Sequence, residues 1–448
     1  MHLKEVYRFE NRLVTKNGHL CWDMDALWNS VLEGLRACRA AGYVPATLGI
    51  DTWAVDFVLL DENGGVLGDT VAYRDGRTEG ERARLEPVLP FAEHYARTGI
   101  QYQPFNTAYQ LTALKREHPE QLAAARTFLM VPDYLNYKLT GVAANEYTNA
   151  STTALVGAAS RDWDDELIAR LGLPRGIFQS ICQPGTVLGR LTPEVQAEVG
   201  FDCTVVLPAT HDTGSAWLAV PARDDRAVYL SSGTWSLLGV ENTVPITSAA
   251  SAAANFTNEG GYGGTYRYLK NIMGLWMIQS VRRELGGQAP DGARPSFPEL
   301  IAAAQEAADF PGVVFTGDDR FLAPRSMIEE VKAACAEAGY PRPETTGQLM
   351  QTIYNSLARD YRRAVEELQG LTGRACTSLN IVGGGSQDGH LNQMTANATG
   401  LPVYAGPTEG TALGNLMVRF LAAGEYPDLQ AGRDAIKQSF TSKEVFPQ

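Results

Sequence analysis

The 448-residue sequence has no long hydrophobic run and no closely spaced cysteine pair. No stretch reaches the roughly 18–20 uninterrupted apolar residues of a membrane-spanning helix, and the first residues, MHLKEVYRFENRL, lack the apolar core of a signal peptide. The six cysteines, at positions 21, 38, 182, 203, 335 and 376, fit neither a zinc site nor a disulfide scaffold. We therefore expect reduced, structural cysteines, no membrane partner and a cytoplasmic location.

Positive charge is scarce as well. The chain carries 38 Lys and Arg against 51 Asp and Glu, a formal net charge of −13. This balance argues against a nucleic-acid partner, which usually requires a basic face. It does not argue against an anionic nucleotide, because backbone N–H groups and a metal ion bind phosphates without a net positive protein. The six histidines are dispersed, so we expect no histidine-ligated metal.

The sequence also lacks two common nucleotide-binding motifs, GxxxxGK[ST] and GxGxxG. Two other glycine-containing turns follow predicted strands: SSGTWS at 231–236 and IVGGGSQ at 381–387. The first offers backbone N–H groups and small hydroxyls to a phosphate. The second lets the backbone approach a phosphate or a flat ring, because glycine has no Cβ. Taken alone, each is also compatible with a plain tight turn.

The order of the remaining patterns predicts an α/β protein. A strand starts near Cys203, a hairpin-like run follows at 227–240, and SLNIV leads through a glycine-rich turn into the helix LNQMTANATG. In the first half, LGIDTWAVDFVLL at 48–60 with the turn DENGG predicts a strand–turn–strand hairpin. The chain is too long for one core, so we place a domain boundary near 205–215. Helices are expected at 107–126, 134–141, 162–172, 271–286, 297–309, 326–338 and 346–370.

The strongest local signal is ATHDTGSA, at 209–216. Asp212 follows a predicted buried strand. A carboxylate at this place can accept the proton of a substrate hydroxyl while that oxygen attacks a phosphorus atom. The alternative is that Asp212 is the N-cap of the following helix. The two interpretations are compatible, because helix N-termini also suit anionic sites.

Two further carboxylates, Asp51 and Asp56, lie five residues apart on the predicted strand. This odd spacing puts them on opposite faces, so we do not expect a carboxylate pair. One of them can line a polar pocket, with Trp53 as an apolar wall for a sugar ring. The alternative is a strand-edge aspartate beside a core tryptophan.

A series of motifs runs through the whole chain: IDTWAVDFVLLD, VAYRDGRT, NTAYQL, PDYLNYKLTG, EYTNASTT, HDTGSA, YLSSGTWSLLG, TNEGG, KNIMGLWMIQ, DDRFLAP and IVGGGSQ. In this order the sequence resembles the FGGY group of carbohydrate kinases, within the actin-like ATPase superfamily. The resemblance implies an α/β protein with the two-domain actin-like (ribonuclease H-like) ATPase fold and an interdomain cleft. It also implies an N-terminal, sugar-binding domain over 1–210 and a C-terminal, ATP-binding domain over 211–448.

The resemblance carries an expected activity. HDT, SSGTWS and KNIMGLW together are similar to the motifs of kinases that act on L-rhamnulose, and they differ from those of xylulose, glycerol and gluconate kinases. This implies ATP-dependent phosphorylation of L-rhamnulose at its C1 hydroxyl, with ATP and Mg²⁺ as cofactors. The alternatives are another deoxy-ketose, such as fuculose, or a catalytically impaired sugar- or nucleotide-binding protein. No metal ligand is predicted, and the oligomeric state, monomer or dimer, stays open.

The resemblance also implies roles for individual residues. Asp212 is the expected general base, which takes the proton of the C1 hydroxyl. ATP contacts are expected from Thr234, Gln279 and Gly384. Ala54 stands where the family motif TWGVDF has glycine, and the methyl group is permitted at this backbone contact if φ is negative and no substrate atom fills the space. The full set of expected substrate contacts is Ala54, His211, Asp212, Thr213 and Asn271.

Kinases of this group open with a phosphate-loop hairpin that reads like D-[LIF]-G-x-S-S-x-R, and MHLKEVYRFE resembles the strand after it. We therefore expect little kinase activity and low stability from the chain as written. The hairpin supplies part of the metal and phosphate site and covers an edge strand. Coupled ADP release with L-rhamnulose, ATP and magnesium compares the chain with a version extended upstream in frame. An extended chain that is neither more active nor more stable contradicts this expectation.

Overall fold

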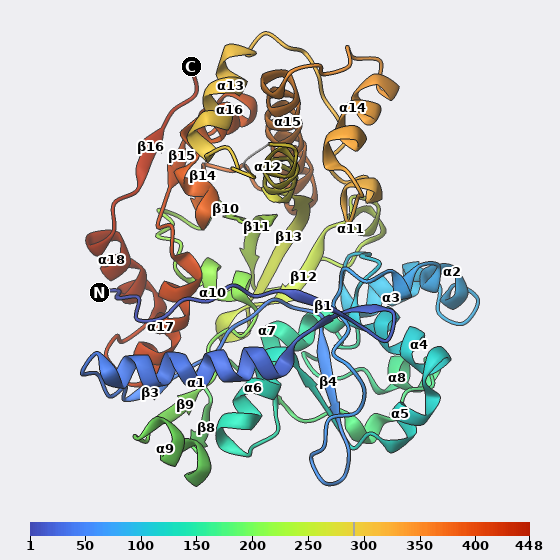
Figure 1. The fold of residues 1–448 in the computed structure, drawn as a ribbon, viewed down its shortest axis with the longest axis vertical. Coiled ribbons are helices and arrows are strands. Elements are labelled where there is room, and N and C mark those ends of the chain that lie inside the picture. The colour runs from blue at the N-terminus through green and yellow to red at the C-terminus, as the bar shows by residue number, and fades with distance from the viewer. Residues whose placement is uncertain (290–291) are drawn as a thin grey trace. The chain divides into compact units, whose positions relative to one another are not determined.

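The computed structural model describes residues 1–289 and 292–448 and contains two compact units (Figure 1). The first unit consists of Met1–Ala219, Glu241–Tyr268 and Thr411–Ser439. The second consists of Val220–Val240, Leu269–Gly410 and Phe440–Gln448. Each unit therefore combines segments that are far apart in the sequence, and both mix helices with strands.

The first unit holds small sheets surrounded by helices. Its main elements are β1 (Leu13–Lys16), β2 (His19–Trp22), α1 (Met24–Ala40), β3 (Thr47–Leu48), β4 (Phe57–Leu60), α2 (Glu81–Leu85), α3 (Phe91–Thr98), α4 (Thr107–Glu117), α5 (Pro119–Ala124), β5 (Thr127–Met130), α6 (Val131–Thr140), β6 (Asn145–Glu146), α7 (Tyr147–Ala150), α8 (Asp165–Arg170), β7 (Ile181–Cys182), β8 (Val187–Arg190), α9 (Pro193–Val199), β9 (Thr204–Val206), α10 (Asp212–Leu218), α11 (Ala249–Ala253), β12 (Thr257–Gly260), α17 (Gly410–Ala422) and α18 (Leu429–Ser439).

A three-stranded sheet of order β3-β9-β8 anchors one part of this unit. β3 pairs in parallel with β9, and β9 pairs antiparallel with β8. The helices α1 and α9 contact each other, and their apolar side chains share one buried cluster with the sheet. Leu32 and Leu35 of α1, Val195 of α9 and Val205 of β9 belong to this cluster. The packing fixes β9, the strand that leads to Asp212.

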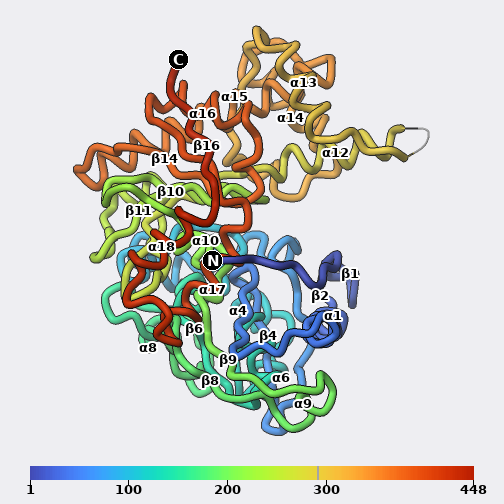
Figure 2. The backbone as a smooth tube through the Cα atoms, turned by 90° about the vertical axis from the view of Figure 1, so that its left-hand side faces the viewer, coloured from blue at the N-terminus to red at the C-terminus, as the bar shows by residue number. Residues whose placement is uncertain are grey.

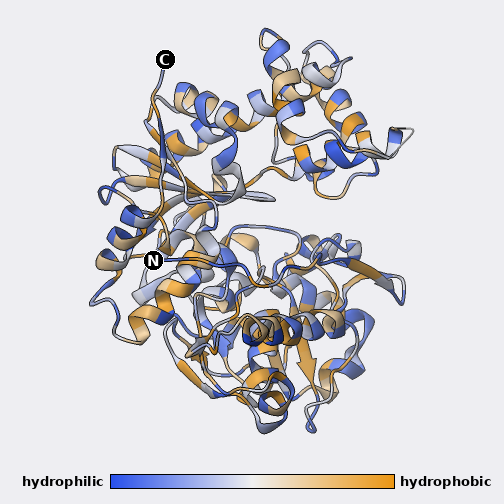
Figure 3. Ribbon diagram, turned by 60° about the vertical axis from the view of Figure 1, so that its left-hand side comes forward, coloured by the Kyte–Doolittle hydropathy of each residue, from blue (hydrophilic) through white to orange (hydrophobic). Residues whose placement is uncertain are grey.

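A second core lies around the antiparallel pair β4 and β5. Four aromatic side chains meet there: Phe128 packs 5.3 Å from Phe57 and 5.0 Å from Phe178, and Trp163 packs 4.9 Å from Phe178 (ring centroids). Such large side chains contribute most of the apolar area that a core buries. In both units, hydrophobic and hydrophilic residues share the same helices, as two-faced helices require (Figure 3).

Two predictions for the first unit need correction. The segment 48–60 is not one strand, because the chain turns between β3 and β4, where Val55 has φ +68°. After β4 the chain folds back at the DENGG turn, but only an isolated bridge between Leu60 and Val66 forms. The predicted helix 107–126 is two helices, α4 and α5. The second begins at Pro119, which has no N–H to continue the first.

The second unit is built on a sheet in which β11, β10, β14, β15 and β16 are successive neighbours, with β13 beside β11. β14 pairs in parallel with β10 and β15, and all five of its residues are buried, as in central parallel strands. β11 and β13 continue into the first unit. The elements are β10 (Ala227–Ser232), β11 (Trp235–Asn242), β13 (Tyr266–Met273), α12 (Trp276–Gln288), α13 (Phe297–Glu306), α14 (Met327–Glu337), α15 (Thr346–Thr372), β14 (Ser378–Val382), α16 (Gly389–Thr399), β15 (Val403–Ala405) and β16 (Lys443–Val445).

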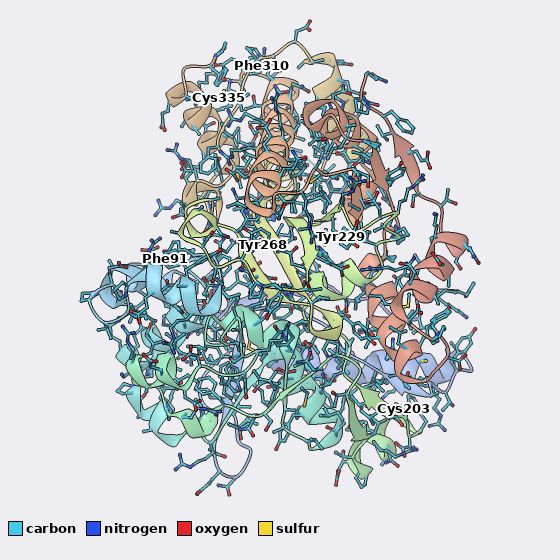
Figure 4. The ribbon with its side chains drawn as sticks, turned by 180° about the vertical axis from the view of Figure 1, so that it is seen from behind. Phe91, Cys203, Tyr229, Tyr268, Phe310 and Cys335 are labelled. Carbon is cyan, nitrogen blue, oxygen red and sulfur yellow. The ribbon has the colours of Figure 1, made fainter. Side chains whose placement is uncertain are left out.

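The long helix α15 contacts α13, α14 and α16. It begins with a capping box between Thr345 and Gln348 and ends at Gly373, which has the left-handed conformation typical of a C-cap. Phe310 and Cys335, labelled in Figure 4, pack around Gly312. The helix expected at 271–286 starts only at Trp276, because the residues before it belong to β13.

The N-terminus lies near α17 and α18 in two views of the backbone, and the chain then runs away from them toward β1 (Figures 1 and 2). The amino group of Met1 donates to Oγ of Ser439, at the end of α18 (2.8 Å). All six cysteines are free, as expected. Among the described residues, no helix combines the length and the apolar character that crossing a membrane demands.

The close contact of α17 with α10 predicts that a larger residue at Gly414 lowers the stability of the fold. A Cβ at Gly414 would lie 1.7 Å from the main-chain O of Ser215, whereas a Cβ at Gly370, exposed on α15, would have no atom within 4 Å. Gly414→Ala is expected to lower the free energy of unfolding by at least the about 1–3 kcal/mol typical of overpacking. Gly370→Ala, the control, is expected to raise it by about 0.4–1 kcal/mol. Urea denaturation measures both, and a Gly414→Ala chain as stable as the parent contradicts the packing.

Candidate active site

The segment that carries Asp212 is held beside Thr52 by main-chain hydrogen bonds. Thr52 N donates to Thr210 O (2.9 Å), and Asp212 N donates to Thr52 O (2.8 Å). Thr52 and His211 form an isolated parallel bridge. The pairing of β3 with β9 thus resumes beyond the ends of both strands, and it fixes the main chain on which Asp212 lies.

A buried carboxylate holds the same segment. Glu146, which is fully buried, accepts hydrogen bonds from N and Oγ1 of Thr210 (2.9 and 2.7 Å) and from N of Thr148 (2.8 Å). Oγ1 of Thr148 accepts from His211 N (3.2 Å). Burial raises the pKa of Glu146, and the hydrogen bonds from Thr148 and Thr210 oppose this rise. Glu146 therefore fixes the residues immediately before Asp212.

Asp212 is the first residue of α10, and 46% of its side chain is exposed. Its Oδ1 accepts from N of Thr213 (2.6 Å) and from Oγ1 of the same residue (3.3 Å). The N-cap residue of α10 is His211, so the interpretation of Asp212 as the N-cap is wrong. A partly solvated carboxylate at a fixed place is suited to accept a proton from a bound hydroxyl.

His211 lies between two buried charged residues and Asp212. Nη2 of Arg267 is 3.0 Å from Nδ1 of His211. Oε2 of Glu259 is 3.1 Å from the same Nη2 and 3.3 Å from Nδ1. The other ring nitrogen, Nε2, is 3.5 Å from Oδ1 of Asp212. Desolvation lowers the pKa of Arg267, and the negative charge of Glu259 opposes this effect.

Asp51 is a second carboxylate near Asp212. Nδ2 of Asn415, on α17, donates to Oδ2 of Asp51 (2.5 Å) and to Gly49 O (3.2 Å). Burial raises the pKa of Asp51 to about 7, the hydrogen bond from Asn415 lowers it, and the charge of Asp212 raises it again. Asp51 directly precedes Thr52, whose main chain bonds to Thr210 and Asp212, so it belongs to the same candidate site.

Asp56 supports Trp53 instead. The buried Oδ2 of Asp56 accepts from Nε1 of Trp22 (2.6 Å), from Nε1 of Trp53 (3.0 Å) and from Tyr73 N (3.1 Å), and Oδ1 accepts from Gln110 (2.9 Å). The two indole rings pack with centroids 4.0 Å apart. Desolvation raises the pKa of Asp56 to about 6, and the indole hydrogen bonds limit the rise. Trp53 is thus held rigidly, and its side chain is only partly buried.

Ala54 lies in the turn between Trp53 and β4. It is not among the residues with positive φ, so the backbone condition for a methyl group at this position is met. The next residue, Val55, has φ +68°, a conformation that β-branched residues rarely adopt. Its carbonyl accepts from Oγ1 of Thr107 (2.7 Å) and Nε2 of Gln110 (3.2 Å), which hold the turn in place.

In the second unit, the SSGTWS turn between β10 and β11 contacts the start of α12. Leu275 N donates to Gly233 O (3.0 Å), and Trp276 N donates to Thr234 O (3.1 Å). Gln279 N donates to Leu275 O (2.8 Å), so Gln279 lies one helical turn further along. Two of the expected ATP-binding residues, Thr234 and Gln279, therefore lie close together.

The second predicted turn, after β14, approaches the end of β10. A Cβ at Gly383 would lie 2.8 Å from Ser232 O, and a Cβ at Gly385 would lie 1.9 Å from Ser232 Oγ, so only glycine permits this contact. Gly384, between them, has no atom within 4 Å of the Cβ position. The two predicted turns therefore meet, and the face of Gly384 is open. The last expected residue, Asn271, lies on β13 in the second unit.

The sequence reasoning missed four residues: Glu146, Glu259, Arg267 and Asn415. The motifs EYTNASTT and TNEGG contain the two glutamates, but a single sequence does not reveal that these side chains are buried beside His211 and Thr210. Asn415 lies 364 residues from Asp51, so no local pattern connects them. Within the described ranges, no group of three or more His, Cys, Asp or Glu side chains is arranged to hold a metal ion.

Comparison with known families gives two matches that together span most of the chain. The model of the N-terminal domain of the FGGY family of carbohydrate kinases matches residues 6–219. The model of the C-terminal domain of the same family matches residues 228–423.

Similar proteins and structures agree with these matches. Proteins named rhamnulokinase are 47% identical in Halalkalibacterium halodurans (99% of this chain, 93% of that protein) and 42% identical in Bacteroides thetaiotaomicron (100% and 91%). A ligand-bound xylulose kinase from Lactobacillus acidophilus has a TM-score of 0.79 at 17% identity, covering 98% of this chain and 88% of that one. Plasmodium falciparum glycerol kinase with ADP has a TM-score of 0.77 at 14% identity, with the same coverage. The predicted two-domain α/β fold is confirmed.

The raised pKa of Asp51 predicts how the stability of the folded chain changes with pH. Its pKa rises from 3.8 to about 7 on folding, so the folded state binds this proton more tightly than the unfolded state. Ionisation of Asp51 therefore costs stability as the pH rises from about 4 through about 7. We expect the melting temperature of Asp51→Asn minus that of the parent, measured by calorimetry, to become larger as the pH rises over this range. Asp225→Asn, at an exposed position, is the control, and equal pH profiles for both variants contradict the assignment.

Proposed function

Because the chain belongs to the FGGY family of carbohydrate kinases, we propose that it transfers the γ-phosphoryl group of ATP to the C1 hydroxyl of L-rhamnulose. The products are L-rhamnulose 1-phosphate and ADP. The observation that carries this proposal is the similarity over nearly the whole chain to proteins named rhamnulokinase. We also propose a cytoplasmic location, where free thiols stay reduced.

Asp212 is the proposed general base. The C1 hydroxyl oxygen attacks the γ-phosphorus, and its proton passes to the Asp212 carboxylate. A C1–O–P bond forms while the bond from the γ-phosphorus to the bridging oxygen breaks, and ADP leaves with that oxygen. The exposure of the carboxylate and the main-chain bonds to Thr52 support this role, because a base must be both accessible and fixed.

The ketose is proposed to contact His211, Thr213, the backbone at Ala54, and Asn271. Trp53, which Asp56 holds in place, supplies an apolar surface against a ring or chain face of the sugar. Because Asp212 is negatively charged and fixed in place, the substrate group beside it is a hydroxyl of the ketose and not a second anion. We assign sugar binding chiefly to the first unit and ATP binding to the second.

ATP is proposed to contact Thr234, Gln279 and Gly384. The open face of Gly384 supports this, because a phosphate or the flat base can reach the backbone there. Magnesium takes one or two carboxylates together with phosphate oxygens and water. When bound, the ion neutralises charge on the transferring phosphoryl group.

A substrate panel tests the activity. Coupled ADP release is measured with L-rhamnulose, L-fuculose, D-xylulose, glycerol and gluconate, on the chain and on its upstream-extended form. We expect the highest kcat/KM for L-rhamnulose, and phosphorus NMR should identify a 1-phosphate product. Preference for another ketose overturns the substrate but keeps the kinase. Binding of ketose and ATP without turnover in either form overturns the enzyme and favours the binding protein.

Asp212→Asn tests the base. We expect kcat to fall by about 10²–10⁴-fold, the usual contribution of general base catalysis, while ketose binding by calorimetry is retained. Asp225→Asn, which removes an exposed carboxylate, is expected to leave kcat unchanged. A kcat reduced less than about tenfold by Asp212→Asn assigns the proton to another group.

A further inference from the structure

The side chains around His211 differ at its two ring nitrogens, and this difference bears on which nitrogen carries the proton of the neutral imidazole. A neutral imidazole carries its single proton on either Nδ1 or Nε2, and the choice decides whether each nitrogen donates or accepts. Nδ1 of His211 faces Arg267 and Glu259, whereas Nε2 faces Asp212. The two ring nitrogens therefore have chemically different partners.

We propose that Arg267 is a positioning residue that keeps the proton of neutral His211 on Nε2. A guanidinium group donates hydrogen bonds and accepts none. Nη2 of Arg267, 3.0 Å from Nδ1 of His211, can therefore bond only to the Nδ1 lone pair. Nδ1 then carries no proton, and the proton of the neutral ring is on Nε2.

The neighbours of Arg267 hold it in this place. The side chain is 1% exposed, its Nε donates to Gly260 O (2.9 Å), and its Nη2 is 3.1 Å from Oε2 of Glu259. Glu259 and Gly260 end β12, and Arg267 lies on β13. A buried charge with these partners is costly to displace, so the guanidinium has a single orientation toward the imidazole.

Glu259 alone would favour the opposite tautomer. Its Oε2 lies 3.3 Å from Nδ1 of His211 and would accept a hydrogen bond from a protonated Nδ1. Arg267 prevents this, because it occupies the Nδ1 lone pair and neutralises the carboxylate. The remaining polar neighbours are Asp212 at Nε2 and Thr148, which accepts from the His211 main chain and links it to Glu146.

The consequence rests on the proposed function. With its proton on Nε2, His211 donates toward Asp212 and toward an oxygen of the ketose bound there. The opposite tautomer would present a lone pair to the Asp212 carboxylate and lose this hydrogen bond to the substrate. Arg267 thereby affects ketose binding without touching the ketose itself.

Nitrogen NMR tests the tautomer without any turnover. The full chain, labelled with ¹⁵N, is studied at about pH 8.5, above the ordinary imidazole range, and His211→Gln identifies the His211 signals. We expect Nε2 of the parent to be protonated and Nδ1 to be bare. In Arg267→Met the proton is expected to move to Nδ1. A parent with protonated Nδ1, or an unchanged tautomer in Arg267→Met, overturns the proposal.

Two further variants separate positioning from general destabilisation. In the double variant Glu259→Gln with Arg267→Met, the shift to Nδ1 is expected to disappear, because the accepting carboxylate is gone. Arg433→Met is the matched control: Arg433 is also buried and paired with a glutamate, Glu241, and bonds to carbonyls of α10. It is expected to lower stability and to leave the His211 tautomer unchanged.

Kinetics test the effect on the substrate. For Arg267→Met we expect KM for L-rhamnulose to rise by about tenfold, the loss of roughly one hydrogen bond, with KM for ATP unchanged. An unchanged ketose KM beside a shifted tautomer overturns the role in substrate binding. Absence of kinase activity in both the parent and its upstream-extended form refutes the proposed function instead, and the tautomer result stands independently.

Discussion

The buried carboxylate of Glu146 is the group on which the geometry around Asp212 depends. A buried carboxylate is costly unless its oxygens are satisfied, and here threonine N–H and O–H groups donate to them. Because Thr210 and Thr148 must remain in place for Glu146, the residues before Asp212 have little freedom. Pairing with Thr52 adds the second constraint. The carboxylate of Asp212, the proposed base, can then stay half-exposed on a main chain that is held in place.

Three aspartates that look alike in the sequence have different environments, and the environments separate their roles. Asp212 is partly solvated, Asp51 is desolvated and has its pKa raised to about 7, and Asp56 is buried under four hydrogen bonds. A solvated carboxylate suits proton transfer, a desolvated one favours its protonated form, and a saturated one suits a scaffold. The environments thus support the proposed base role for Asp212 alone and a supporting role for Asp56.

Local patterns predicted the parts of the site that depend on local chemistry. The strand before Asp212 and the glycine turns were visible because apolar runs and glycine requirements are encoded within a few residues. The strand across Asp51 and Asp56 was predicted wrongly, since the positive φ of Val55 depends on distant hydrogen-bond donors from α4. The helix predicted over 271–286 is wrong for its first residues, because β13 extends to Met273. The partnership of His211 with Arg267 arises from tertiary packing, which no local window contains.

The discontinuous make-up of the first unit decides how this protein can be dissected. A fragment that stops at Ala219 retains Asp212 and His211 but loses Glu259, Arg267 and Asn415, which come from later segments. Such a fragment would keep Asp212, the proposed general base, while losing the groups proposed to orient His211 and the amide that bonds to Asp51. Domain exchange with a related kinase would likewise have to move three separate stretches together. Recombination that separates any of these three stretches would therefore disrupt the first unit, even though the chain forms only two units.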